Sequence, residues 1–237
     1  MSNLFYQTIK AKELFNQTFR AKDPFYISNL VARYPEPQDL VEGLFLRAFI
    51  DAYHRVKFEP KVKSLNENDI RNLFIADFKV SNIPLNKYIQ NNVITIASEN
   101  QANTKNLVQR TDIELHSGIH QIHFVIECKK LSSAETRYVQ GTTKNGKYEI
   151  DGLEKFLDLQ YAENESKAAM VGFVVSGDVV KITKSLKQKV AVFNPHKKMN
   201  AYIDLQCIGW DNSFQSLHLK KDSSSLSLYH LFFDFSK

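Results

Sequence analysis

The hydrophobic pattern changes its period near residue 90, and this change most constrains the fold. Apolar residues between Leu40 and Val56 recur at helical spacing, as do those between Asn66 and Phe78, where Asn66 is a candidate N-cap. Beyond residue 90 the pattern becomes strand-like, and strands and helices then alternate. We expect strands at 93–96, 108–116, 119–129 and 169–175, helices at 149–163 and 177–193, and three strand-like runs between 201 and 235. This order predicts an α/β (α+β mixed) fold, with a central mixed sheet flanked by helices.

Composition narrows the class of protein. Of the 237 residues, 43% are hydrophobic and 24% are charged, which is ordinary for a globular chain and excludes a fully disordered one. A formal net charge of +5 permits an acidic partner such as nucleic acid without requiring one. The two cysteines, Cys128 and Cys207, cannot form a disulfide framework or a four-cysteine zinc site.

No segment has the pattern of a signal peptide or of a membrane span. Lys10, Lys12 and Glu13 interrupt the N-terminal segment before an apolar stretch develops. The longest apolar run, 168–175, is far too short to cross a bilayer. We therefore expect no membrane association and a cytoplasmic location.

A carboxylate two residues before a lysine is a pattern with chemical meaning when it lies on a strand. Residues i and i+2 of a strand point to the same face, so the acid and the lysine can then share one site. The pattern occurs four times, and only Glu127-Cys128-Lys129 follows a strand-like run. Burying these charges at the end of an apolar strand is costly unless they pair with each other or serve a site.

A second carboxylate is expected beside this pair. Asp112 is predicted to lie on the preceding strand, and a hairpin folded at Ser117-Gly118 would bring it next to Glu127 and Lys129. The backbone carbonyl of Cys128 would point sideways from the strand and could add another oxygen ligand. Carboxylates that hold a divalent metal, with a cation nearby, are the groups that phosphodiester hydrolysis needs.

Asp112 followed fifteen residues later by Glu127-Cys128-Lys129 resembles the PD-(D/E)XK nuclease superfamily, which has the restriction-endonuclease-like fold. Thr111 stands where that motif has proline. The core order of the family, helix, three-stranded antiparallel unit, helix and strand, is similar to the expected order over residues 66–175. Weaker likenesses to restriction-type and defence-associated members lie downstream, at Tyr138, Gly152-Leu153, Lys155-Phe156, Tyr161-Ala162, 170–174, 214–218 and 229–231.

The resemblance implies a role for each matching residue. Asp112 and Glu127, with the Cys128 carbonyl, would ligate Mg²⁺, for which Mn²⁺ could substitute. Lys129 would orient the attacking water and stabilise charge on the phosphate. A further acid commonly comes from the first core helix, and Glu67 shares the apolar stripe of its helix, while Glu42 lies at the edge of its own. We expect Glu67 to complete the catalytic and metal site, with Glu42 as the alternative.

The function implied is Mg²⁺-dependent hydrolysis of DNA by an endonuclease of restriction or phage-defence type. Lys144, Lys147, Lys155 and Tyr161 are candidate substrate contacts. The alternative is a catalytically inactive protein of the same fold that binds nucleic acid or acts as an assembly subunit. A homodimer is also expected, because two active sites related by a twofold axis suit double-strand cutting. The resemblance further implies partner proteins of a defence system.

Two further interpretations concern domains and histidines. Residues 1–60, including a loose helical stripe over 3–20, are expected to form an N-terminal helical extension that serves dimerisation or DNA contact, ahead of a nuclease-like domain at 61–237. His116, His120 and His123 gather around one turn, but we interpret them as structural, because no acidic or cysteine neighbour is expected to complete a metal site.

Overall fold

The computed structural model describes residues 24–98, 101–104, 107–198, 201–204 and 208–237, with only the backbone of 101–104, 107–110 and 204. The predicted helical stripe over residues 3–20 lies outside these ranges. The helical elements are α2 (Pro24–Arg33), α3 (Pro37–Leu40), the π-helical turn η1 (Val41–Leu46), α4 (Arg47–Val56), η2 (Val62–Ser64), α5 (Glu67–Val80), α6 (Leu85–Gln90), η3 (Thr136–Tyr138), α7 (Leu153–Leu157) and α8 (Val179–Val192).

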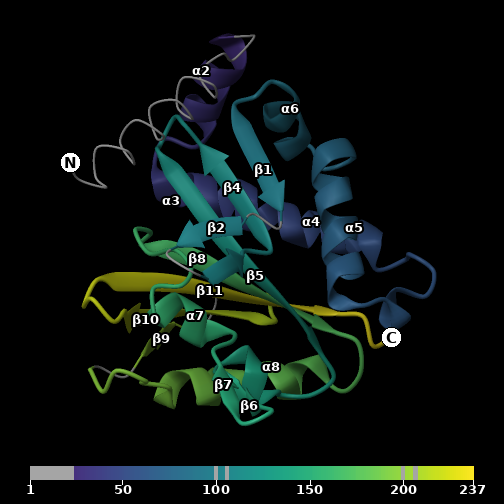
Figure 1. Cartoon of the computed structure of the whole chain (residues 1–237). Coiled ribbons are helices and arrows are strands. Elements are labelled where there is room, and N and C mark those ends of the chain that lie inside the picture. The colour runs from purple at the N-terminus through teal and green to yellow at the C-terminus, as the bar shows by residue number, and fades with distance from the viewer. Residues whose placement is uncertain (1–23, 99–100, 105–106, 199–200, 205–207) are drawn as a thin grey trace.

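A seven-stranded mixed sheet forms the centre of the molecule (Figure 1). Its strands, in spatial order, are β1 (Ile94–Ser98), β4 (Ile113–Ser117), β5 (Ile122–Leu131), β8 (Lys167–Val174), β11 (Ser225–Asp234), β10 (Ser213–Leu219) and β9 (Tyr202–Asp204). Strands β5, β8 and β11 are parallel, and the other neighbours are antiparallel. Two small hairpins, β2 (Gln101–Thr104) with β3 (Leu107–Arg110) and β6 (Thr142–Lys144) with β7 (Lys147–Glu149), stand apart. The mixed α/β prediction is confirmed.

Helices cover both faces of the sheet. On one face, Phe49 of α4 and Phe74 of α5 pack with Phe124 and Phe173 of the sheet, and the Phe74 and Phe173 rings stack at 5.3 Å. On the other face, α7 and α8 pack over a second apolar cluster (Figure 1). Burial of these aromatic side chains contributes about 1.5–3 kcal/mol each to folding. The sheet therefore separates two apolar cores, one on each face, and the ends of its strands lie at the boundary between these cores.

The described part of the N-terminal segment belongs to the first of these cores. Leu30 of α2, Phe45 of η1 and Phe49 of α4 are fully buried there. These helices thus cover one face of the sheet directly. The domain boundary at residue 60 and the dimerisation or DNA-contact role of 1–60 stay predictions.

The alternation of β5 decides which side chains reach which face. Phe124, Ile126 and Cys128 pack in the α4–α5 core. Glu127 and Lys129 point to the opposite face, where α7 lies, because successive strand residues alternate. The prediction that Glu127 and Lys129 share one face of a strand is confirmed, although β5 begins at Ile122, after a turn that extends through Gln121.

The predicted elements differ from the structure in three places. The strand expected at 108–116 is broken at Thr111 and Asp112, where β3 leaves for its own hairpin with β2. The short helix α6 lies between the last helix and the first strand that were expected, where no element was predicted. The helix expected at 149–163 is only Leu153–Leu157, because Gly152 before it and Leu159 after it both adopt positive φ. No helix among the described residues is long and apolar enough to cross a membrane.

Candidate active site

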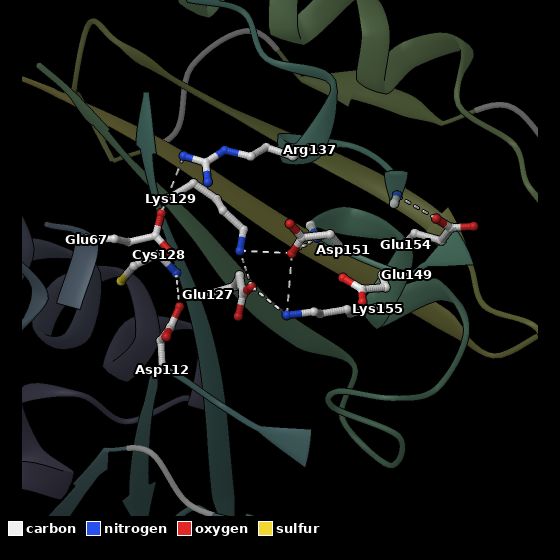
Figure 2. Close-up of polar contacts among 12 residues, drawn as sticks. Glu67, Asp112, Glu127, Cys128, Lys129, Arg137, Glu149, Asp151, Glu154 and Lys155 are labelled. Carbon is white, nitrogen blue, oxygen red and sulfur yellow. Dashed lines mark hydrogen bonds and ion pairs between the residues drawn. The ribbon is translucent and has the colours of Figure 1, made fainter. Parts of the chain in front are cut away.

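Four of the predicted site residues, Glu67, Asp112, Glu127 and Lys129, come together near the carboxyl end of β5 (Figure 2). They arrive from three places in the chain. Glu67 begins α5, Asp112 occupies the bend before β4, and the other two lie on β5. We call these four residues, with Asp151 and Lys155, the β5 cluster.

Asp112 is held by two donors at the point where β4 stops pairing with β5. Its Oδ2 accepts the backbone N–H of Cys128 at 2.7 Å, and its Oδ1 accepts Arg71 Nη1 of α5 at 2.8 Å. The N–H and C=O of a strand residue point to the same side. The Cys128 carbonyl is therefore directed toward the edge at which Asp112 lies. Asp112 was predicted within a strand, and its place in a bend agrees with the low strand propensity of aspartate.

The Glu67 carboxylate reaches the same edge of β5 at Lys130, two residues beyond Cys128. Its Oε2 accepts the backbone N–H of Lys130 at 2.6 Å and lies 3.8 Å from Nη2 of Arg137. Asn66 starts the helix as predicted, since its side chain accepts the N–H of Asp69 at 2.9 Å. The cap fixes the first turn, and so it fixes where the Glu67 carboxylate leaves the helix.

Glu127 and Lys129 form a buried ion pair, with exposed fractions of 2% and 6%. Lys129 Nζ lies 2.7 Å from Glu127 Oε1 and 2.9 Å from Asp151 Oδ1. Lys155 Nζ lies 3.0 Å from the same Glu127 oxygen and 3.5 Å from Asp151 (Figure 2). Two carboxylates and two ammonium groups therefore alternate within one partly closed site. Such a network is tolerated in a buried place because each charge has partners of the opposite sign.

The environment of this network shifts the pKa of each member. Burial raises the pKa of Glu127, and the Lys129 ammonium opposes that rise. For Lys129, burial lowers the pKa, but the charges of Glu127 and Asp151 outweigh it, so the pKa is raised above its usual value. Burial also raises the pKa of Asp151, but Lys129 and Lys155 outweigh this, and its pKa is lowered. Both lysines thus stay charged at neutral pH.

Asp151 is the member of the cluster that the sequence analysis missed. It directly precedes Gly152, whose φ of +58° and close approach to the backbone of Tyr138 admit no side chain. A Cβ atom at residue 152 would lie 2.3 Å from the Tyr138 carbonyl oxygen. The glycine therefore allows the chain to turn sharply into α7, which places Asp151 and Lys155 over the end of β5. An aspartate four residues before Lys155 was the available signal.

Two predicted substrate contacts, Lys155 and Tyr161, lie at this site. The Tyr161 hydroxyl accepts Lys155 Nζ at 3.1 Å, and the ammonium lies 4.7 Å from the centre of the Tyr161 ring. Burial, with the charge of Glu127, raises the pKa of Tyr161 to about 12. Tyr161 is therefore a neutral hydroxyl that fixes the direction of the Lys155 side chain.

The other predicted residues lie elsewhere. Glu42 contacts Gln38 and accepts the hydroxyl of Tyr229 at 3.0 Å, on the α4–α5 face, so it does not join the β5 cluster. Lys144 and Lys147 lie on the exposed β6–β7 hairpin, where Lys144 is 3.7 Å from Glu149. Among the described contacts, neither lysine touches the cluster. The Cys128 thiol is buried in the apolar core, and burial raises its pKa well above the usual value, which excludes a nucleophilic thiolate.

The oxygen donors of the cluster suit a hard divalent cation. Asp112, Glu127 and the Cys128 carbonyl offer the oxygen ligands that Mg²⁺ prefers, and Mg²⁺ commonly binds one or two carboxylates and keeps its waters. The carboxylates of Glu67, Asp112 and Glu127 do not all lie within 4.8 Å of one another in the described structure. A shared cation would therefore draw Glu127 away from the lysines, or would use two carboxylates only.

Comparisons with known proteins assign no role to the residues of this site. No protein-family model, curated protein or solved structure matches this chain. The roles of the clustered residues thus rest on their geometry and on the motif. The arrangement offers carboxylate oxygens to a divalent cation and places the Lys129 and Lys155 ammonium groups beside them.

Proposed function

We propose that this protein is a Mg²⁺-dependent deoxyribonuclease that hydrolyses phosphodiester bonds in DNA. The observation that carries the proposal is the meeting of Asp112, Glu127 and Lys129 at the end of β5, with Asp112 bonded to the Cys128 N–H. An acid, a second acid and a lysine are the groups that the resemblance to PD-(D/E)XK nucleases implies at such a strand end.

The order of elements around the site adds support. Helix α5 precedes the antiparallel unit β1-β4-β5, and α7 then leads to β8, which is parallel to β5. This is the order that the resemblance implies for the catalytic core. It leaves the carboxyl end of β5 beyond the last pair it makes with β4, Ile113 with Ile126, and there Asp112 and Glu67 accept the backbone N–H groups of Cys128 and Lys130.

Each residue has a definite task under this proposal. Asp112, Glu127 and the Cys128 carbonyl would hold Mg²⁺ or Mn²⁺, which when bound polarises the phosphate and lowers the pKa of a bound water. Lys129 is charged, so it acts as an electrostatic group that orients water and stabilises charge on the phosphate, rather than as a general base. Asp151 positions Lys129, and Lys155 neutralises part of the carboxylate charge that would otherwise repel DNA.

Cleavage of supercoiled plasmid with Mg²⁺ or Mn²⁺ tests this function. We expect Asp112→Asn, Glu127→Gln and Lys129→Ala each to lose on the order of 10²–10³-fold in rate. Glu42→Gln is the matched control, since it makes the same carboxylate-to-amide change outside the cluster and should cut normally. Undiminished cleavage by both Asp112→Asn and Lys129→Ala would contradict the assignment. RNA in a parallel assay separates a ribonuclease from a deoxyribonuclease.

A second candidate function is binding without cleavage, by an inactive protein of the same fold. The observation that favours it is the internal neutralisation of the site: Arg71 pairs with Asp112, while Lys129 and Lys155 both pair with Glu127. Such a site would bind DNA with an affinity that falls steeply with salt and would leave the DNA intact with every divalent ion. A homodimer and partner proteins of a defence system remain expectations that follow from the resemblance. A cytoplasmic location remains the expectation drawn from the sequence pattern alone.

A further inference from the structure

A second group of metal-ligating side chains lies on the same face of the sheet, away from the β5 cluster. Glu114 and His116 are two residues apart on β4, so they share a face, and His123 on β5 is directly opposite His116. Their ligand atoms all lie within 4.8 Å of one another, and in the described part of the chain no other trio of this kind does. The expectation that the histidines lack an acidic neighbour is therefore wrong, because the neighbour is Glu114, across the register of the hairpin.

Two of the three ligand-to-ligand distances in this trio fall in the range of a zinc coordination shell. Glu114 Oε2 lies 3.3 Å from His116 Nε2 and 3.4 Å from His123 Nε2. Ligand atoms bound at 2.0–2.2 Å in a tetrahedron are separated by about 3.3–3.6 Å. Nε2 of His123 is buried, and among the described residues it makes only this ion-pair contact and no well-aligned hydrogen bond.

Partners outside the trio already orient its members. Nδ1 of His123 lies 3.2 Å from Glu165 Oε1, which leaves Nε2 to face Glu114. Thr111 donates its hydroxyl to Glu114 Oε1 at 2.5 Å, which leaves Oε2 to face the histidines. The loop that carries Glu165 is anchored by buried Lys220, whose Nζ donates to the carbonyls of Ala162, Glu163 and Glu165. A carboxylate behind the distal ring nitrogen is the usual support of a metal-bound histidine.

We propose that Glu114, His116 and His123 form a binding site for a divalent transition cation of the Zn²⁺ class, with an open fourth position. Imidazole nitrogens favour Zn²⁺ over Mg²⁺, so the site is chemically distinct from the oxygen donors of the β5 cluster. His123 and Glu127 are four residues apart on one strand, about 13 Å, which is too far for a two-metal catalytic pair. The proposal thus stands independently of the nuclease function.

Binding requires one local movement. The His116 and His123 rings are stacked 4.3 Å apart and 7° from parallel, so their lone pairs do not yet converge on one point. A tilt of each ring about its Cβ–Cγ bond brings both Nε2 atoms toward the same point, and both rings are partly exposed, so there is room for it. Water or an exchangeable anion would fill the open position.

The test titrates the purified full chain with Zn²⁺ by calorimetry in excess Mg²⁺, and with Co²⁺ by visible absorption. We expect about one Zn²⁺ per chain and the intense Co²⁺ bands of four-coordinate geometry. His116→Phe and His123→Phe keep the stacked ring pair and should lose both signals. Glu165→Gln, which touches no metal, should weaken Zn²⁺ binding by about 10–100-fold.

Two controls locate the ion. His120→Phe makes the same change in the turn that joins β4 to β5, at a histidine that bonds the Tyr34 carbonyl instead, and should leave binding unchanged. Asp112→Asn removes a carboxylate from the β5 cluster and should leave it unchanged as well. Absence of Zn²⁺ binding by the wild type, undiminished binding by His116→Phe, or loss of binding in Asp112→Asn would each overturn the proposal. Circular dichroism identifies variants that fail to fold, and Glu165→Gln still tests the site if a histidine variant does.

Discussion

The charges of Glu127, Lys129, Asp151 and Lys155 alternate in sign. A double-mutant cycle on Lys129 and Glu127 tests how strongly these charges are coupled. Lys129→Met replaces a buried ammonium with a side chain of similar length and leaves Glu127 and Asp151 facing the single ammonium of Lys155. Glu127→Gln has the opposite effect, because two ammonium groups then face Asp151 alone. In the double variant the charges balance again, since Asp151 and Lys155 remain as a pair 3.5 Å apart.

The magnitude follows from the distances. At 2.7 Å and an effective dielectric constant of about 20, the Lys129–Glu127 attraction is about 6 kcal/mol before the desolvation of each ion is subtracted. Removing one partner of a buried pair typically costs about 3–5 kcal/mol. Because Lys155 stays 3.0 Å from Glu127, we expect about 2–3 kcal/mol for each single variant. The double variant should lie within about 1 kcal/mol of the wild type, so the coupling should be about 3–6 kcal/mol.

Urea unfolding followed by circular dichroism, in EDTA to remove divalent ions, measures these free energies. The matched control is Lys144→Met with Glu149→Gln, an ion pair at 3.7 Å whose side chains are 69% and 56% exposed. Its coupling should be less than about 1 kcal/mol. Additive losses in the buried pair, or single-variant losses below about 1 kcal/mol, would show that these charges are not coupled as described. The double variant should also be stable and unable to cut DNA, which separates the folding role from the catalytic one.

Three further predictions concern the rest of the fold. Burial lowers the pKa of the His218 imidazole from 6.5 to about 4. The contribution of this group to the free energy of unfolding is therefore complete above pH 6.5 and falls by about 3 kcal/mol toward pH 4. Urea unfolding across this range should show the loss, and a smaller loss in His218→Asn. Gly152→Ala should lower the melting temperature and the rate of plasmid cleavage together, because the added Cβ meets the Tyr138 carbonyl. Phe74→Ala should cost about 3–5 kcal/mol in chemical denaturation, while Phe58→Ala, at a ring 77% exposed, should cost about 0.5 kcal/mol or less.

Caps and apolar periodicity, which involve residues close together in the sequence, predicted the parts of the helices and strands that depend on such neighbours. Asn66 caps α5 as expected, and the apolar alternation of β5 correctly separates Cys128, in the core, from Glu127 and Lys129. The short helix α6 was not predicted, because its six residues carry too little periodicity to distinguish it from a polar loop. Thr111 and Asp112 interrupt a run that reads as one strand, and only the tertiary contacts of Asp112 explain the bend.

Sequence reasoning missed one residue in each of the two sites because its place there depends on contacts between residues far apart in the chain. Asp151 contacts Lys129, which lies 22 residues earlier in the chain, and the residues around Lys129 do not predict this contact. Glu114 approaches His123 only because the turn at 118–121 sets the register that pairs His116 with His123. A one-residue slip of that register would move the histidine to the opposite face. The register therefore decides whether this metal site can exist, and sequence alone did not give it.

The place of β11 has a consequence for how the chain assembles. Residues 225–234 come last among the strands, yet they lie between β8 and β10, in the interior of the sheet. During synthesis, every residue of the β5 cluster emerges before the strand that completes the sheet. Until then β8 presents an unpaired parallel edge, which exposes backbone donors and acceptors to other chains. The sheet therefore cannot close around β8 until residues 225–234 have been synthesised.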